Sequence, residues 1–478
     1  MIEKYSELLP KLDAWIAENR EKLIEDILSA VSIRSVAVPQ EGKYPFGEGC
    51  AKVLDHILKV SEGYGFATEN NEYYCGSATL GGTSGKKSIG IYAHMDVVPE
   101  GEGWTKPPYE PWILDDKYIV GRGGSDNKGP ALGALYALRF LKEHEIALQN
   151  DVRLVFGCAE EIGMPDMDYY TVNVPQPDFS LVPDCGFPVC HGEKGLAKIT
   201  AEADVSGSNL IDFDAGEVFN IIAAEAQARI GGVSFELASE KLAAEGITVE
   251  PNGDGVLIKS VGRSSHAAFP QGSDDAIGKL ARALVASGLL TGAAKSAVGF
   301  VADSTTDYYG AGLDIPFEDE ASGKLTHVLS IIRVKNGRLE INYDIRYPVT
   351  TSESDVKPRL ESKLRENGFS VTNSSYNAPN YIPLDNPFVP LLTDISNELL
   401  GLDLKPYTMG GGTYARKIPN AIGYGPGAFG PGVPKVEPIF PPGRGGGHQP
   451  DEALDVGMVL TMIRIYVISL LELDKTLA

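Results

Sequence analysis

Apolar residues recur with two different periods in the first part of this chain. Residues 6–31 and 48–58 carry them at every third or fourth position, which predicts two amphipathic helices. Short apolar runs at 88–93, 152–158 and 179–182 instead predict buried strands. Strands that alternate with helices are typical of an α/β layer around a mostly parallel sheet.

The pattern changes after about residue 191, where longer strands and helices follow one another in a different order. The predicted strands are 197–205, 255–261, 329–334 and 339–347, and the predicted helices are 216–229, 274–290 and 352–366. This order is typical of an α+β domain, in which helices cover one face of a sheet.

The α/β pattern returns near the end of the chain. A helix is predicted at 388–400, followed by a long Gly/Pro-rich loop at 423–447 and a terminal helix. We therefore expect a discontinuous α/β catalytic domain, built from residues 1–192 and 377–478. An α+β lid domain at 193–376 is expected to be inserted into it.

Composition and charge narrow the class of protein. Hydrophobic residues make up 43% of the 478 residues and charged residues 22%, which excludes a disordered chain, a collagen and a coiled coil. There are 65 acidic and 42 basic residues, a net charge of −23, and no run of Lys or Arg. An acidic chain without a basic patch disfavours a nucleic-acid partner.

The location of the protein is inferred from its apolar segments and its cysteines. The most apolar stretch, 454–473, contains Asp455, Arg464 and Glu472, so we expect a buried helix and no membrane partner. Five cysteines, an odd number, disfavour a disulfide framework, and the first residues contain no apolar signal segment. Both observations favour a cytoplasmic protein.

Metal-ligand residue types follow the predicted strands of the α/β layer, at the edge where such sheets place their sites. The set comprises His94, Asp96, Asp126, Glu160, Glu161, Asp184 and His448. Two of them, Glu160 and Glu161, directly follow an apolar strand, and unpaired carboxylates beside a sheet are costly to bury. A cation, or a raised pKa on one of the two carboxyl groups, would remove that cost.

Mixed histidine and carboxylate ligands suit Zn²⁺, with Mn²⁺ and Co²⁺ as alternatives. A pair of ions needs one bridging carboxylate, and a terminal carboxylate and a histidine for each ion. The set provides two histidines and three carboxylates for that purpose, and leaves Asp96 and Glu160 for supporting and base roles.

The motifs around these residues resemble those of the M20 metallopeptidases, and within them the bacterial PepV-type dipeptidases. The matching segments are AHMDVVP at 93–99, GRGGSDNKGP at 121–130, EE at 160–161, PD at 183–184, GEKG at 192–195, SHA at 265–267, DIRYP at 344–348 and GGGTY at 410–414. They occur in the family's order and extend over nearly the whole chain. The resemblance implies a zinc-exopeptidase catalytic domain with an inserted lid domain.

The resemblance also implies a role for each residue of the set. His94 and Asp184 would bind one metal ion and Glu161 and His448 the other. Asp126, often followed by a cis peptide bond in this family, would bridge both ions. Asp96 would orient the ring of His94. Glu160 would be the general base.

Five further residues, in or next to the inserted domain, are candidates for contacts with the substrate. His266 is either a structural residue or the donor that stabilises the tetrahedral oxyanion. Arg346 forms either a surface ion pair or a fork for the carboxylate of the substrate. Gly411 and Gly412 form either a flexible turn or a cradle of backbone N–H groups. Asn220 aligns with a lid asparagine of the family.

The expected function is therefore that of a metal-dependent dipeptidase of broad specificity, acting on small peptides with two divalent ions. The long inserted domain, which replaces a partner subunit in PepV-type enzymes, favours a monomer. The main alternative is an N-acyl-amino-acid deacylase of the same family, a desuccinylase or deacetylase, which would share every ligand. A solute-binding protein would be exported and would not need both Glu160 and the complete ligand set.

Overall fold

The computed structural model describes residues 2–477, which form two compact units. The first unit comprises the chain up to His191, Ile382–Tyr407 and the chain from Gly412 on, and the second comprises Gly192–Tyr381 and Thr408–Gly411. The chain passes between the units four times: within β9 (Cys190–Glu193), after β20 (Asn380–Tyr381), within β21 (Tyr407–Met409) and between Gly411 and Gly412. The α/β class expected from the sequence is confirmed. The second unit is inserted into the sequence of the first.

The first unit is built on a mixed sheet in which parallel strands occupy the centre. Its strands follow the order β1-β2-β6-β3-β7-β22, and β6, β3, β7 and β22 run parallel to one another. The bounds are β1 (Ala67–Asn71), β2 (Cys75–Leu80), β3 (Ser88–His94), β6 (Asp151–Gly157), β7 (Phe179–Val182) and β22 (Ala421–Gly423). The three predicted strands are therefore β3, β6 and β7, at the centre of this sheet.

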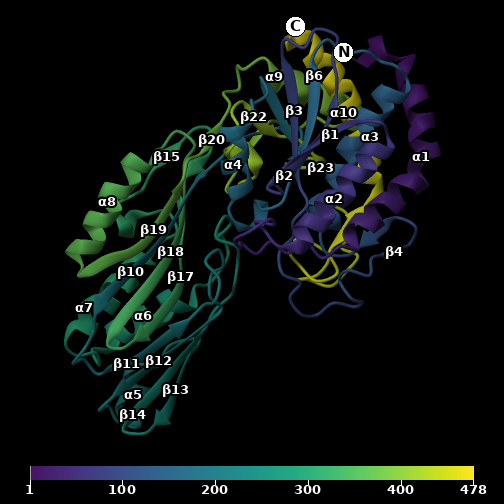
Figure 1. Ribbon diagram of the computed structural model, residues 1–478. Helices are drawn as coiled ribbons and strands as arrows, with labels where there is room; N and C mark the ends of the chain where they lie inside the picture. Colours follow the sequence, from purple (N-terminus) through teal and green to yellow (C-terminus); the bar gives the residue numbers. More distant parts are fainter. Residues whose placement is uncertain (1, 478) are drawn as a thin grey trace. The chain divides into compact units, whose positions relative to one another are not determined.

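Helices pack against this sheet and against one another (Figure 1). They are α1 (Leu8–Val31), α2 (Glu48–Gly63), α3 (Gly129–Glu143), α4 (Pro165–Asn173), α9 (Phe388–Leu400) and α10 (Val456–Leu477). Helix α3 contacts both β3 and β6, and α10 packs on α3 and α9. A second, three-stranded sheet contains β4 (Trp112–Leu114), β5 (Tyr118–Val120) and β24 (Ala453–Asp455). The predicted helices 6–31, 48–58 and 388–400 correspond to α1, α2 and α9.

The terminal helix α10 is long and apolar enough to cross a membrane, and it is the single such helix among the residues described. Most of it is buried, however: 72% of its most apolar stretch lies inside the protein. Val459, Ile463 and Tyr466 belong to the main hydrophobic core of the first unit. Core packing therefore accounts for its apolar character, as expected for a buried helix.

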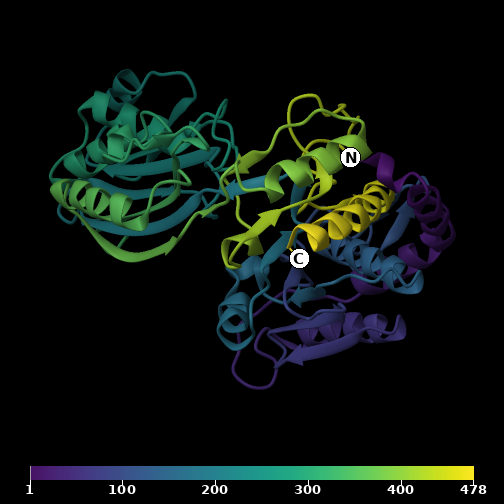
Figure 2. The same ribbon diagram turned by 90° about the horizontal axis from the view of Figure 1, so that it is seen from above.

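The second unit is an antiparallel sheet with helices on one side of it (Figure 2). The eight strands follow the order β13-β14-β12-β11-β17-β18-β10-β19. Their bounds are β10 (Gly195–Asp204), β11 (Leu210–Ala215), β12 (Glu225–Gly231), β13 (Ile247–Asn252), β14 (Gly255–Val261), β17 (Thr326–Lys335), β18 (Arg338–Tyr347) and β19 (Phe369–Asn377). The helices are α5 (Phe235–Lys241), α6 (Ala276–Ser287), α7 (Ala293–Ser304) and α8 (Glu353–Glu366), and β15 (Glu318–Asp319) and β16 (Gly323–Lys324) form a small hairpin.

Alternation along the strands explains which face of the second sheet is covered. In β10, Ala197, Ile199 and Ala201 are buried, whereas Lys198 between them is exposed. The buried side chains join residues of α6, α7 and α8 in one hydrophobic core. One face of the sheet therefore carries the core, as the period of two predicts.

Two sequence-based predictions of secondary structure are wrong. The helix predicted at 216–229 is absent, because residues from Glu225 form strand β12 in the middle of the sheet. Its buried positions, Ala226, Ala228 and Ile230, alternate with period two, and strand pairing on both sides outweighs the helix propensity of alanine. The long loop predicted at 423–447 also contains a short strand, β23 (Pro426–Ala428), which pairs with β8 (Cys185–Phe187).

Candidate metal centre

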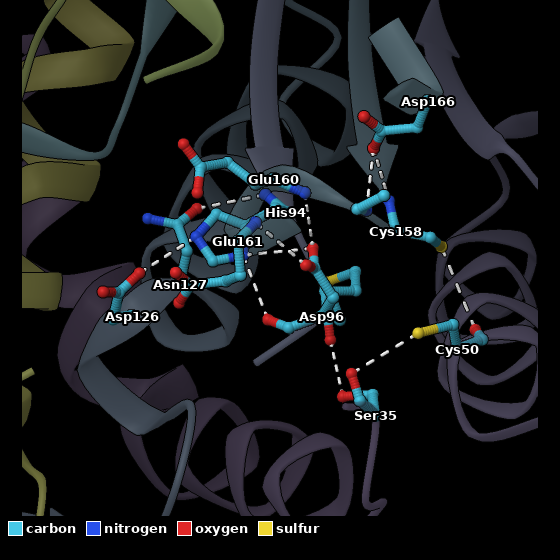
Figure 3. A network of polar contacts seen from close by, with 12 residues as sticks. Ser35, Cys50, His94, Asp96, Asp126, Asn127, Cys158, Glu160, Glu161 and Asp166 are labelled. Atoms are coloured by element: carbon cyan, nitrogen blue, oxygen red, sulfur yellow. Dashed lines mark hydrogen bonds and ion pairs between the residues drawn. The ribbon is translucent and has the colours of Figure 1, made fainter. Parts of the chain in front are cut away.

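The metal-ligand residues of the first unit meet at the carboxyl edge of its parallel strands (Figure 3). His94 is the last residue of β3, and Glu160 and Glu161 form a helical turn three residues after β6. Asp184 follows β7 by two residues. Parallel strands end at the same edge of a sheet, so residues far apart in the sequence converge there.

Asp126 lies between the two histidines of the set. Its Oδ1 is 2.9 Å from Nε2 of His94, and its Oδ2 is 3.1 Å from Nε2 of His448. Each histidine has a second carboxylate beside it. Nε2 of His94 is 3.8 Å from Oδ2 of Asp184, and Nε2 of His448 is 3.0 Å from Oε1 of Glu161. The arrangement is thus two histidine–carboxylate pairs that share one aspartate.

This donor set fits divalent cations. Ligand atoms of His94, Asp126 and Glu161 lie within 4.8 Å of one another, and so do those of His94, Glu160 and Asp184. In the described part of the chain, no Lys or Arg forms an ion pair with Asp126, Glu160 or Glu161. Several carboxylates in one partly buried cluster repel one another, and a bound cation relieves that repulsion.

The pKa values of the cluster reflect burial and charge in different proportions. Burial raises the pKa of Glu160 well above the usual value, and nearby Asp184 and Glu161 add to the effect. Burial also raises the pKa of Glu161, against the hydrogen bond from His448. Burial disfavours protonation of His94, but its bonds to Asp126 and Asp96 outweigh this and raise its pKa.

Asp96 supports both His94 and the glutamate turn. Nδ1 of His94 donates to the backbone carbonyl of Asp96 at 3.0 Å, so in the neutral ring the lone pair is on Nε2, the nitrogen that faces the cluster. The Asp96 carboxylate accepts hydrogen bonds from the backbone N–H groups of Glu160 and Glu161, each at 3.1 Å. Because Asp96 is completely buried, it fixes the ring and the turn relative to each other.

Asn127 is a supporting residue that sequence reasoning missed. Its Oδ1 accepts from the backbone N–H of His94 at 3.3 Å, and its Nδ2 donates to Oδ1 of Asp184 at 3.1 Å. The peptide bond between Asp126 and Asn127 is cis, as the family resemblance implied. One residue thus ties together three of the ligand-bearing segments. Asn127 is part of the motif GGSDNKG, but the sequence does not show which groups its side-chain amide contacts.

Comparisons with known proteins decide the family. The model of peptidase family M20/M25/M40 matches residues 90–472 of this chain. The chain belongs to peptidase family M20. It is a metallopeptidase, and the resemblance stated from its motifs is confirmed.

Relatives of this M20 peptidase match over almost the whole chain. The Bacillus subtilis (strain 168) protein YtjP is 30% identical, with 96% of this chain and 99% of that protein aligned. The Beta-Ala-Xaa dipeptidase of Lactobacillus delbrueckii subsp. lactis is 28% identical over 95% and 97% of the two chains. The aminoacylhistidine dipeptidase structure from Vibrio alginolyticus shares the fold, with a TM-score of 0.58, 15% identity, and 94% and 96% of the two chains covered.

The second unit of the M20 peptidase contains the remaining predicted site residues except Gly412, which begins the last segment of the first unit. Nδ1 of His266 accepts a hydrogen bond from the backbone N–H of Ala268 at 3.2 Å, and Nε2 of His266 is 3.5 Å from Nδ2 of Asn220. A Cβ on Gly410 would lie 3.0 Å from Cβ of Ala268 and 3.6 Å from Cδ of Arg346. The His266 turn, the glycine segment and Arg346 are therefore neighbours.

Arg346 is buried and already has protein partners. Its Nε and Nη2 donate to the two oxygens of Asp344 at 2.9 and 3.2 Å, and Nη1 donates to the carbonyl of Gly410 at 2.5 Å. Among the described residues, these bonds use three of its five N–H groups. The sequence did not predict the pairing with Asp344, which fixes the plane of the guanidinium.

The glycines of the triplet have different surroundings. A Cβ on Gly412 would lie 2.4 Å from Nη2 of Arg416, whereas one on Gly411 would meet its nearest neighbour, the Met409 side chain, at 3.6 Å. A side chain at position 412 would therefore require the guanidinium of Arg416 to move.

Asp166, a buried carboxylate, is a second supporting residue that sequence reasoning missed. It accepts hydrogen bonds from the backbone N–H groups of Cys158 and Ala159 at 2.8 and 2.9 Å and from the hydroxyl of Tyr414. The ring of Tyr414 lies edge-on to that of His94. Burial and the charge of Asp96 raise the pKa of Asp166 to about 7, against these hydrogen bonds.

We expect Asp166 to make stability fall as the pH rises from about 4 to 7. Its pKa is about 7 in the folded protein and about 3.9 in an unfolded chain. The folded state thus holds a proton that the unfolded state has lost. Relative to Asp166→Asn, the free energy of unfolding of the wild type should fall by roughly 3 kcal/mol between pH 5 and pH 8. Urea titrations at both pH values measure it.

The control is Asp168→Asn, which changes an exposed carboxylate of the same helix, α4. It should show no comparable dependence on pH. A constant difference between wild type and Asp166→Asn across this range would contradict a raised pKa at Asp166.

Proposed function

We propose that this M20 peptidase is a dipeptidase of broad specificity that uses two divalent ions and Glu160 as general base. One observation carries the proposal: Asp126 lies between His94 and His448, and each histidine has its own second carboxylate. The name of the Lactobacillus relative, a Beta-Ala-Xaa dipeptidase, supports a dipeptide substrate. A monomeric, cytoplasmic enzyme is part of the same proposal.

His94 and Asp184 would hold one ion, His448 and Glu161 the other, and Asp126 both. When bound, such a pair polarises the scissile carbonyl and lowers the pKa of a water molecule. Zn²⁺ is the first choice for this mixed ligand set, and Mn²⁺ and Co²⁺ are the alternatives.

Glu160 is suited to the role of base because its carboxylate forms no pair of its own, although it lies within 4.8 Å of the ligand atoms of His94 and Asp184. Among the described residues, no side chain forms a hydrogen bond or ion pair with it, while its backbone N–H is held by Asp96. Burial raises its pKa, which strengthens it as a base. Glu160 would take a proton from the attacking water and deliver it to the leaving amine.

His266 is suited to donating a hydrogen bond to the oxyanion. The N–H of Ala268 occupies Nδ1, so the proton of the neutral ring sits on Nε2. A donor placed at the developing negative charge stabilises the transition state. Nδ2 of Asn220 lies 3.5 Å from that nitrogen and cannot accept its proton, so Asn220 would instead contact the substrate beside the ring.

Arg346 would bind the carboxylate of the dipeptide with the N–H groups that remain on its terminal nitrogens, aided by the backbone of Gly411 and Gly412. Asp344 keeps the guanidinium in one orientation, so little side-chain entropy is lost when substrate binds. A substrate with a blocked carboxylate would lose this contact.

We expect Arg346→Lys to raise KM about 10- to 100-fold for an unblocked dipeptide, because hydrogen bonds to a charged group contribute about 1.5–3 kcal/mol. The dipeptide amide should be a poor substrate for the wild type and change little in the variant. Steady-state kinetics on both substrates measures this. Arg333→Lys, which changes another ion-paired arginine of the same sheet, is the control. Equal losses on dipeptide and amide would contradict the assignment.

The function is tested with metal-free protein to which Zn²⁺, Mn²⁺ or Co²⁺ is added. Release of amino acids is measured from a panel of α- and β-alanyl dipeptides beside N-acetyl and N-succinyl amino acids. Metal-dependent cleavage of several unblocked dipeptides supports the proposal. Cleavage of the N-acylated compounds alone would instead make the protein a deacylase with the same site.

A further inference from the structure

Glu452 is a buried glutamate that the proposed reaction does not use. It is completely buried and lies four residues after His448. Its Oε1 accepts from the backbone N–H of Asp126 at 3.1 Å, and from the N–H and hydroxyl of Ser125 at 2.9 and 3.2 Å. One carboxylate oxygen therefore holds the backbone of the aspartate shared by both histidines.

The other oxygen of Glu452 connects to Arg122. Oε2 accepts from Nη1 of Arg122 at 2.7 Å and from the N–H of Gly123 at 3.1 Å. Nη2 of Arg122 in turn donates to the backbone carbonyl of His448 at 3.3 Å and to that of Glu100 at 3.1 Å. The ion pair thus links the backbone of Asp126 to that of His448, although more than 300 residues separate them in the chain.

The two histidines differ in how they are held. His94 ends a central strand, is 1% exposed, and is fixed by Asp96 and Asn127. The side chain of His448 is 52% exposed, and its backbone lies in a loop with a φ of 64°. The position of His448 therefore depends more on contacts such as the one from Arg122.

We propose that the Glu452–Arg122 pair is a positioning device that sets the distance between Asp126 and His448. It would thereby determine the affinity of the metal position formed by Asp126, Glu161 and His448 more than that of the His94 position, which shares Asp126 but keeps the contacts of His94 with Asp96 and Asn127. The inference rests on the proposed function, because it assumes that these residues bind metal. Ligand groups must be held to within about 0.5 Å of their working geometry, which is what the linked backbone contacts provide.

The first test is Glu452→Gln, which keeps one oxygen of the side chain and replaces the other by an NH₂ group. The side-chain carbonyl of glutamine can still accept from Ser125 and Asp126, but its NH₂ group would face two donors, Arg122 and Gly123. Metal-free protein is titrated with Zn²⁺ by calorimetry, and with Co²⁺ while the absorption spectrum is recorded. We expect the second equivalent to bind about 10- to 100-fold more weakly, with an altered Co²⁺ spectrum, and the first equivalent to be affected clearly less.

A second variant avoids an unpaired buried charge. Arg122→Met combined with Glu452→Gln removes both charges, and replacing a buried ion pair by neutral groups is often nearly neutral for stability. It should weaken the second equivalent in the same way. Glu472→Gln is the matched control, because Glu472 is also a buried, ion-paired glutamate of the first unit but bonds Lys4 and Lys475. It should bind both equivalents as the wild type does.

The outcomes separate this inference from the proposed function. Wild-type protein that binds fewer than two ions would contradict the proposed function itself. If the wild type binds two ions, an unchanged second equivalent in both variants would overturn the inference. Equal weakening of both equivalents would also overturn it, because a purely structural role of the pair would act on the whole site.

Discussion

Glu160→Gln is expected to lower kcat for dipeptide hydrolysis by about 10²- to 10⁴-fold, the range that a positioned general base contributes. Glutamine keeps the shape of the side chain but cannot take a proton from water. The backbone N–H of residue 160 would still bond to Asp96, so the turn should keep its place. KM and the bound metal should change little. The measurements are steady-state kinetics and metal content of the purified variant.

The neighbouring variant, Glu161→Gln, provides the contrast. Glu161 lies 3.0 Å from His448, whereas Glu160 has no such partner among the described residues. Glu161→Gln should therefore lose metal as well as activity. If Glu160→Gln keeps more than about a tenth of wild-type kcat, or loses metal like its neighbour, the division of roles between the two glutamates is wrong.

The second large effect is expected at Asp126. Its two oxygens face His94 and His448, so Asp126→Ala would take a ligand from both metal positions at once. We expect activity to disappear and the stabilisation by metal to be lost. A ligand present at 100 times its dissociation constant stabilises the folded state by about 2.7 kcal/mol. The wild type should show a gain of this size with added Zn²⁺, and the variant almost none.

Thermal unfolding with and without Zn²⁺, together with the number of ions bound, measures this prediction. Asp151→Asn is the control, because Asp151 starts β6 at the opposite edge of the sheet and bonds the backbone of Gly82. It should keep the wild-type response to metal. An Asp126→Ala protein that still binds two ions would show that Asp126 is not the shared ligand.

The spacing of the apolar residues, and the polar residues that follow each apolar run, were sufficient to predict the strands that carry the metal centre. The apolar runs that became β3, β6 and β7 are short and followed by polar residues, so the sites after them could be placed at one edge of the sheet. The prediction was wrong at β12, where alanines compatible with a helix are buried on alternate positions of a central strand. Only pairing with β11 and β14 decides between the two.

The sequence by itself determined the α/β class, the residue types of the metal centre and, through the resemblance of its motifs to a known family, the membership of M20. Tertiary structure alone decided which groups hold those residues in place. Asn127 and Glu452 act through hydrogen bonds to the backbone of distant segments, and Asp166 through the hydroxyl of the distant Tyr414. Any buried carboxylate or amide needs such partners, but the sequence does not show which ones. A strand end is encoded locally, whereas a contact such as that of Glu452 with Asp126 exists only once the core has brought both segments together.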